Sequence, residues 1–167
     1  LCHIRGVTRW GQQLDQLIGR LGYRRYEAQG GDWGSMVTQS MGMTETEHCA
    51  AIHINMPIVA PDPDTMDNLT AQEQSALVDM GAYMEQGSGY SKQQSTRPQT
   101  LGYGLADSPV GQMAWVVEKF YMWTDCEKAG TKHPENVLTK DELLDHVMMY
   151  WLNNSASSSG RLYWESF

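Results

Sequence analysis

The sequence is short of cysteine, of positive charge and of long apolar runs. Its 12 Lys and Arg residues stand against 20 Asp and Glu residues, a formal net charge of −8, which disfavours a nucleic acid or an anionic membrane surface as partner. No segment approaches the roughly 20 apolar residues of a membrane-spanning helix. Three widely spaced cysteines, Cys2, Cys49 and Cys126, fit neither a disulfide framework nor a metal site. We expect free, buried thiols and a cytoplasmic protein.

The chain also lacks an initiator methionine and a secretory signal, since it begins Leu1-Cys2-His3. We therefore expect that its natural N-terminus, with any membrane anchor, is missing. Its 167 residues, 41% of them hydrophobic and 19% charged, are typical of an ordinary globular protein that can bury a core.

Hydrophobic spacing predicts an alternation of helices and strands in the first third of the chain. Apolar residues three and four apart indicate a helix, and short apolar runs indicate strands. The expected elements are a helix at Trp10–Leu21 closed by Gly22, a strand at Tyr23–Gln29, a helix at Ser35–Gly42 and a strand at Ala50–Met56. This order is the repeating unit of a parallel sheet covered by helices.

From Pro57 onward the sequence predicts helices and no convincing strand. Thr70 three residues before Glu73 is a capping-box pattern, and Ser108-Pro109 is a helix start. The expected helices are Thr70–Gln86, Val110–Trp123 and Thr139–Leu152, with a Ser-rich loop at Asn153–Gly160. We therefore predict an α/β fold in which residues 1–57 form part of a core and residues 58–167 form a helical cap domain.

The run Gly30-Gly31-Asp32-Trp33-Gly34 places an acidic residue between glycines, after a predicted strand and before a predicted helix. Small residues are needed where a strand turns sharply into a helix, and this pattern is typical of the nucleophile elbow of α/β-hydrolases. Aspartate in place of serine forms an ester with an electrophilic carbon, which suits an epoxide or a haloalkane. The alternative is a Gly-rich turn in which Asp32 only caps the next helix.

Five segments together resemble the microsomal-type epoxide hydrolases, members of the α/β-hydrolase superfamily. They are Gln29–Ser35 together with the strand His53–Met56 that follows it, then Ser95–Gly111, Val117–Phe120 and Met149–Glu165. The resemblance covers nearly the whole chain and is specific in Ser95–Gly111 and Val117–Phe120. It implies an enzyme that opens a small apolar epoxide to a vicinal diol without a metal or an organic cofactor.

The resemblance also implies the roles of four residues. Asp32 is the nucleophile, and Tyr90 and Tyr163 donate hydrogen bonds to the epoxide oxygen, as protonated phenols can at neutral pH. The backbone N–H of Trp33 belongs to the oxyanion hole. Among the eight tyrosines, Tyr83 and Tyr103 compete with Tyr90 for the donor role.

The family pattern requires two further parts that this sequence does not contain. One is an upstream His-Gly-x-Pro segment, and the other is a late histidine that activates water. The five histidines all precede the place of the latter, so none is assigned to catalysis. We therefore expect a central fragment that is inactive alone. Two alternatives stay open: a haloalkane dehalogenase, which shares the elbow, and a truncated, non-catalytic member that binds apolar ligands.

Overall fold

The computed structural model describes residues 5–59 and 61–166, and its contacts divide the chain into two compact units. The first runs to Gln86 and the second from Gly87 to Glu165. The predicted boundary between core and cap lies at residue 57, so the assignment of residues 58–86 to the cap stays a prediction. Each unit is described by itself below.

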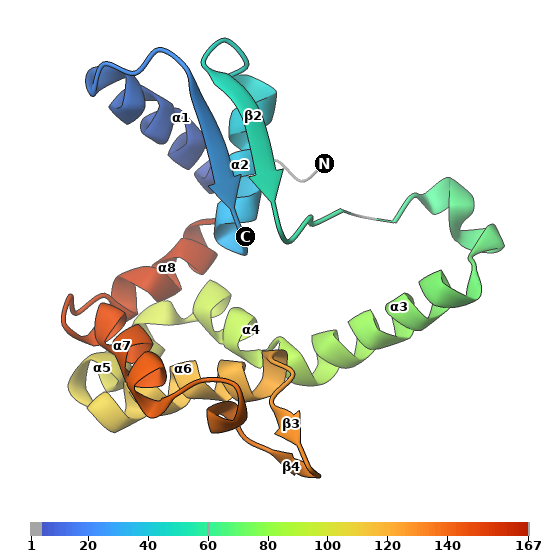
Figure 1. Cartoon of the computed structure of the whole chain (residues 1–167), viewed down its shortest axis with the longest axis vertical. Coiled ribbons are helices and arrows are strands. Elements are labelled where there is room, and N and C mark those ends of the chain that lie inside the picture. Colours follow the sequence, from blue (N-terminus) through green and yellow to red (C-terminus); the bar gives the residue numbers. More distant parts are fainter. Residues whose placement is uncertain (1–4, 60, 167) are drawn as a thin grey trace. The chain divides into compact units, whose positions relative to one another are not determined.

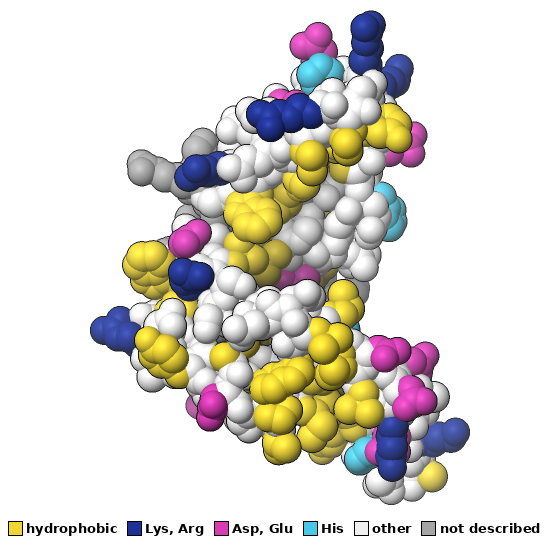
Figure 2. Space-filling model, turned by 90° about the vertical axis from the view of Figure 1, so that its left-hand side faces the viewer, with side chains coloured by type: hydrophobic (Ala, Val, Ile, Leu, Met, Phe, Trp, Pro, Cys, Tyr) yellow, Lys and Arg dark blue, Asp and Glu magenta, His cyan; other side chains and the backbone are white. Residues whose placement is uncertain are grey.

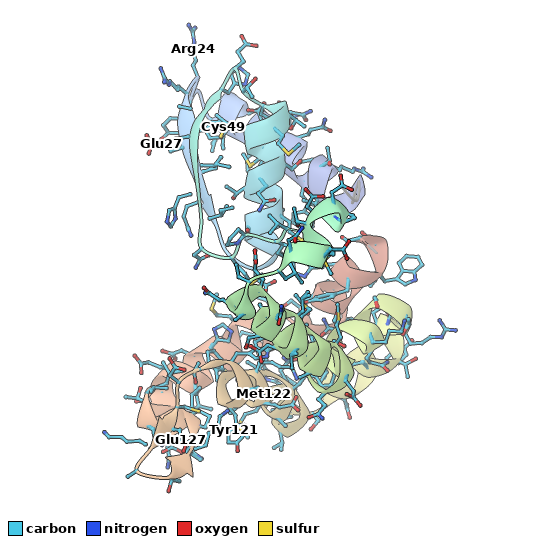
Figure 3. The ribbon with its side chains drawn as sticks, turned by 90° about the vertical axis from the view of Figure 1, so that its right-hand side faces the viewer. Arg24, Glu27, Cys49, Tyr121, Met122 and Glu127 are labelled. Atoms are coloured by element: carbon cyan, nitrogen blue, oxygen red, sulfur yellow. The ribbon has the colours of Figure 1, made fainter. Side chains whose placement is uncertain are left out.

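The first unit begins with two helices and two strands in the predicted order (Figure 1). They are α1 (Arg5–Arg20), β1 (Tyr26–Gly30), α2 (Trp33–Thr44) and β2 (Cys49–Ile54). The strands pair in parallel, with Ala28 opposite Ile52, as predicted. Helix α2 packs against both strands and against α1, and both helices lie on the same side of the strand pair (Figure 3).

Glycine ends α1 as expected. Gly22 has a φ of 90°, a left-handed conformation that glycine adopts without a steric penalty. The backbone N–H of Tyr23 then donates to the carbonyl of Ile18 at 3.2 Å, which satisfies a carbonyl at the end of the helix. At the same end of the strands, the Tyr26 hydroxyl donates to Asp15 at 2.9 Å. Burial and this hydrogen bond raise the pKa of Tyr26.

Much apolar surface of this unit is exposed. Along α1 and the residue that follows it, large apolar side chains spaced three to four residues apart are between 39% and 66% exposed: Trp10, Leu14, Leu17 and Leu21. Figure 2 shows apolar side chains running along this part of the surface. Ile52 on β2 is 42% exposed as well, although parallel strands are usually covered on both faces.

The chain continues through a 3₁₀ turn (Pro63–Asn68), helix α3 (Ala71–Ala82) and one π-helical turn (Tyr83–Gly87). The capping box at the start of α3 is confirmed, because Glu73 N–H donates to the Thr70 hydroxyl and Thr70 N–H donates to the Glu73 carboxylate. The Thr70 hydroxyl and N–H together lower the pKa of Glu73. None of the described residues of α3 is buried.

The described part of the second unit is built mainly from five α-helices, with short connections except between the third and the fourth, where a hairpin and a 3₁₀ turn (Pro134–Asn136) intervene. The five helices are α4 (Gly89–Thr96), α5 (Pro98–Asp107), α6 (Pro109–Trp123), α7 (Lys140–Trp151) and α8 (Ala156–Ser166). Helix α6 packs against both α5 and α7. It begins as predicted, with Pro109 in the first turn and the Ser108 hydroxyl accepting from Gly111 N–H at 3.0 Å.

Helices α4 and α5 were not among the helices predicted from the sequence, and two further features of this unit differ from the predictions. The first is a minimal hairpin, β3 (Glu127–Lys128) and β4 (Thr131–Lys132), where no strand was expected. Ala129 and Gly130 between the strands both have positive φ, 53° and 78°, as a type I′ turn requires. The Lys132 ammonium lies 5.0 Å from the centre of the Tyr121 ring, so the hairpin packs on the end of α6 (Figure 3).

The second difference concerns the Ser-rich segment, which was predicted as a loop from Asn153 to Gly160. Helix α8 in fact begins at Ala156 and includes Ser157, Ser158 and Ser159. A Cβ at Gly102 of α5 would lie 2.3 Å from Ser157 Oγ, and one at Gly160 would lie 3.4 Å from Pro98. Small residues are therefore present because α8 approaches α4 and α5 closely, not because the segment is a loop.

The described cysteines behave as predicted. Cys49, at the start of β2 (Figure 3), and Cys126 are both free and buried, while Cys2 lies outside the described residues. Within residues 5–59 and 61–166 no helix has the length and apolar character that a membrane crossing requires.

Candidate active site

The turn between β1 and α2 holds Asp32 in a strained backbone conformation. Asp32 has φ 49° and ψ −127°, a region that residues other than glycine rarely occupy and that costs on the order of 1–3 kcal/mol. Its side chain is exposed. Strain of this kind persists only where the surrounding structure enforces it, and it is common at functional sites.

The glycines of the motif are not equivalent. A Cβ at Gly30 would lie 2.1 Å from the carbonyl oxygen of Gly34 and 2.6 Å from Thr38 Oγ1. A Cβ at Gly31 would lie 2.3 Å from the Asn55 side-chain oxygen, whereas one at Gly34 would meet nothing within 4 Å. The first turn of α2 therefore folds directly onto the end of β1. Among these three glycines, only at Gly30 would an added Cβ collide with backbone atoms.

A buried serine fixes the start of α2. Ser35 is fully buried, and its hydroxyl donates to the carbonyl of Met56, just after β2, at 2.6 Å. Its backbone N–H donates to the Asp32 carbonyl at 3.0 Å. The turn that carries Asp32 is thus tied to the second strand as well as to the first.

The Asp32 carboxylate is oriented by the next residue. Trp33 N–H donates to Asp32 Oδ1 at 2.6 Å, so Asp32 does cap α2. This contact is compatible with a nucleophile too, because it fixes one carboxylate oxygen with a donor of the kind that stabilises a developing oxyanion. The capping interpretation and the nucleophile interpretation therefore describe the same geometry.

In the second unit, the structure brings Tyr90 and Tyr163 together. Tyr90 lies in the first turn of α4 and Tyr163 on α8. Their ring centres are 5.9 Å apart with an interplanar angle of 79°, an edge-to-face contact. Both side chains are half-buried. Of the two competing tyrosines, Tyr103 is 69% exposed on α5 and Tyr83 is 37% exposed before α4.

Comparison with known proteins gives the family. No model of a protein family matches the chain. A protein of Stigmatella aurantiaca that is provisionally named an epoxide hydrolase is 47% identical over 96% of this chain. The juvenile hormone epoxide hydrolase of Bombyx mori is 34% identical over 90% of it. The chain belongs to the epoxide hydrolase family. It spans about 36% of the length of each of these two relatives.

A solved structure agrees with this family membership and gives the fold. The epoxide hydrolase of Aspergillus niger superposes on 95% of the chain with a TM-score of 0.80 and 31% sequence identity, over 39% of its own chain. The fold is therefore that of an α/β-hydrolase, represented here by part of the core and a predominantly helical segment. This confirms the predicted fold class.

Sequence reasoning missed several residues around the tyrosine pair. Trp123 meets Tyr90 edge-on, with ring centres 5.3 Å apart. The Lys119 ammonium lies 5.2 Å from the ring centre of Tyr90 and 5.2 Å from that of Trp115. A signal was available, because residues 115, 119 and 123 are four apart and share one face of α6.

Three of the described histidines, His48, His133 and His146, have contacts that give them a structural role, while His53 is exposed on β2. His48 Nδ1 lies 3.1 Å from Asp15 Oδ1. His133 accepts from Glu135 N–H at 3.2 Å, and His146 packs edge-on against Phe120 with ring centres 5.0 Å apart. That none of them is catalytic stays a prediction.

Proposed function

We propose that the protein hydrolyses a small apolar epoxide to a vicinal diol through an ester on Asp32. The observation that carries the proposal is the strained, exposed aspartate at the β1–α2 turn, held by Trp33 N–H. Family membership supports it, since the relatives are named epoxide hydrolases. The two buried free thiols support the further prediction of a cytoplasmic location.

In the first step, a carboxylate oxygen of Asp32 attacks one ring carbon and the C–O bond at that carbon breaks. The freed oxygen becomes an alkoxide that takes a proton from Tyr90 or Tyr163. Two adjacent phenols can share this work, one donating the proton while the other keeps a hydrogen bond to the same oxygen. The 5.9 Å separation of their ring centres is compatible with two hydroxyls converging on one atom.

In the second step, water adds to the ester carbonyl and the bond between the acyl carbon and the alkyl oxygen breaks. The diol leaves, the Asp32 carboxylate is restored, and the proton set free as water converts the ester to a carboxylate returns to the tyrosinate. Charge develops on the carboxyl oxygen that was not alkylated, and Asp32 Oδ1 already accepts from Trp33 N–H, which supports the oxyanion role of that donor. The family resemblance implies that a histidine, which is none of the five in this sequence, acts as the general base that takes a proton from this water.

The experiment follows the oxygen of water into Asp32. The full-length protein is turned over with styrene oxide in H₂¹⁸O, digested and analysed by mass spectrometry. We expect ¹⁸O in the peptide that contains Asp32, since water attacks the acyl carbon. Asp32→Ala should form no diol, while Asp79→Ala, an exposed carboxylate on α3, should behave as the unmodified protein does.

Three results would contradict the proposal. Label found only in the diol would mean direct attack of water on the epoxide. Diol formation by Asp32→Ala would assign the nucleophile to another residue. Release of chloride from a chloroalkane, with no diol from styrene oxide, would favour a haloalkane dehalogenase instead.

A further inference from the structure

Lys119 occupies an unusual place for a lysine, between two aromatic rings. Its ammonium lies 5.2 Å from the ring centres of both Tyr90 and Trp115, and only 17% of its side chain is exposed. A cation over an aromatic face is attracted by the ring quadrupole, and more strongly where water is excluded. Glu118, which is 54% exposed, forms an ion pair with it.

The Trp115 ring beside the Lys119 ammonium is held in place by a hydrogen bond. Trp115 Nε1 donates to the Oε1 of Gln94 at 3.1 Å, and Gln94 on α4 is buried. Trp115 therefore cannot turn away without breaking a hydrogen bond inside the unit. The Trp115 ring thus keeps the Lys119 ammonium in contact with the Tyr90 ring.

The charge of Lys119 also acts on the chemistry of the ring that it contacts. A positive charge beside a phenol stabilises the form in which negative charge collects on the oxygen, so it makes the hydroxyl a stronger hydrogen-bond donor. Tyr90 is the ring that also meets Tyr163, with centres 5.9 Å apart. The positive charge of Lys119 therefore acts on Tyr90, one member of the tyrosine pair.

We propose that Lys119 is a positioning residue for the epoxide-oxygen site: its ammonium holds the Tyr90 ring beside Tyr163 and strengthens the Tyr90 hydroxyl as a donor to the developing alkoxide. This inference rests on the proposed function, which assigns the oxygen to these two tyrosines. It adds a residue that acts through Tyr90 without contacting the substrate.

The test compares three variants in the full-length protein by single-turnover formation of the ester from styrene oxide. Lys119→Met removes the charge and keeps the apolar stem, and it should slow alkylation by roughly 3- to 10-fold, because the Tyr90 hydroxyl becomes a weaker proton donor. Lys119→Arg keeps a cation that can stack on the rings and should retain most of the rate. Glu118→Gln removes the ion-pair partner of Lys119 and should leave the alkylation rate unchanged.

A double-mutant cycle separates an electrostatic role from a packing role. In the Tyr90→Phe background the hydroxyl is gone, so Lys119→Met should cause no further loss. In the Tyr163→Phe background its full effect should persist. An equal loss with and without the Tyr90 hydroxyl, or equal losses for the Met and Arg variants, would overturn the proposal.

A spectroscopic readout needs no turnover. The tyrosinate absorbance of Tyr90, taken as the difference between the unmodified protein and Tyr90→Phe, should appear at higher pH in Lys119→Met than in the unmodified protein. Lys119 on α6 and Tyr163 on α8 are titratable side chains in contact with Tyr90, and Glu118 forms an ion pair with the lysine. An unchanged titration would overturn the role of Lys119.

The two levels of inference fail differently. If the unmodified protein forms no ester with styrene oxide at all, the proposed function is wrong. If it forms the ester and Lys119→Met alkylates at the unmodified rate, only the role of Lys119 is wrong.

Discussion

Alanine substitution at two glycines of the same turn should have opposite effects. At Gly30 a Cβ would lie 2.1 Å from the carbonyl oxygen and 2.3 Å from the carbonyl carbon of Gly34. Carbon atoms in contact prefer about 3.5–4.0 Å, so the first turn of α2 must move by about 1 Å. At Gly34 nothing lies within 4 Å of the new methyl group.

The energies follow from these distances. Overpacking usually costs about 1–3 kcal/mol, and Gly30→Ala should lie at the upper end, about 3 kcal/mol, because the obstacle is backbone. Gly34 is the second residue of α2, where alanine is the better helix former by up to about 1 kcal/mol. The two variants should therefore differ by about 4 kcal/mol in the free energy of unfolding. Gly31→Ala should fall between them, since the flexible Asn55 side chain can turn aside.

Activity should follow the same order. A shift of about 1 Å in α2 displaces Asp32, and misplacement of that size can cost about 100-fold in rate. The assays are urea denaturation and single-turnover alkylation of the full-length protein by styrene oxide. With a slope of about 1–3 kcal/mol per molar urea, the denaturation midpoints should differ by more than about 1 M. Equal midpoints and equal rates for Gly30→Ala and Gly34→Ala would refute the reasoning.

Three further predictions concern single side chains. Asp32→Ala and Asp32→Gly should both lose about 10⁴- to 10⁶-fold in alkylation rate. The Gly variant should nevertheless have a free energy of unfolding in urea that is larger by about 1–2 kcal/mol, because a φ of 49° strains alanine but not glycine. Equal free energies of unfolding would show that the turn is unstrained. Tyr90→Phe and Tyr163→Phe should each slow alkylation by roughly 10- to 1000-fold, and the double variant by much more; a double variant that alkylates at the unmodified rate would make both tyrosines packing residues. The Thr139 backbone N–H and then its hydroxyl lower the pKa of Glu142. The contribution of Glu142 to stability is therefore present above its ordinary pKa of 4.5 and is lost as pH falls through the lowered value. The Tm difference between the unmodified protein and Glu142→Gln should shrink between about pH 6 and about pH 3, and a constant difference would contradict this.

The core elements and the elbow could be predicted because their signals are local. Apolar spacing gives α1, although Arg5–Arg20 begins five residues before the predicted start, in a part with few large apolar side chains. The turn at Asp32 follows from glycines next to an acidic residue. Spacing could not show, however, that backbone crowds Gly30 while Gly34 faces open space.

Among the missed elements, the hairpin and the start of α8 depend on contacts between distant segments. Two-residue strands such as β3 and β4 carry no period, so only the Ala129-Gly130 turn marks the hairpin. The serines at the start of α8 favour a loop by composition, but close packing of Ser157 on Gly102 gives them a place in a helix. Tertiary packing here outweighs local preference.

The two parts of the proposed site are therefore encoded differently. Asp32 is placed by one short turn, which a reader can recognise from five consecutive residues. Tyr90 is placed by side chains from two other helices, Lys119 and Trp123 on α6 and Tyr163 on α8. Backbone substitutions should then dominate the behaviour of the nucleophile, and helix-packing substitutions that of the oxygen donors. A conservative change such as Trp123→Phe, which reshapes the wall of Tyr90 and leaves the elbow untouched, should lower the alkylation rate without changing the attachment of the ester to Asp32.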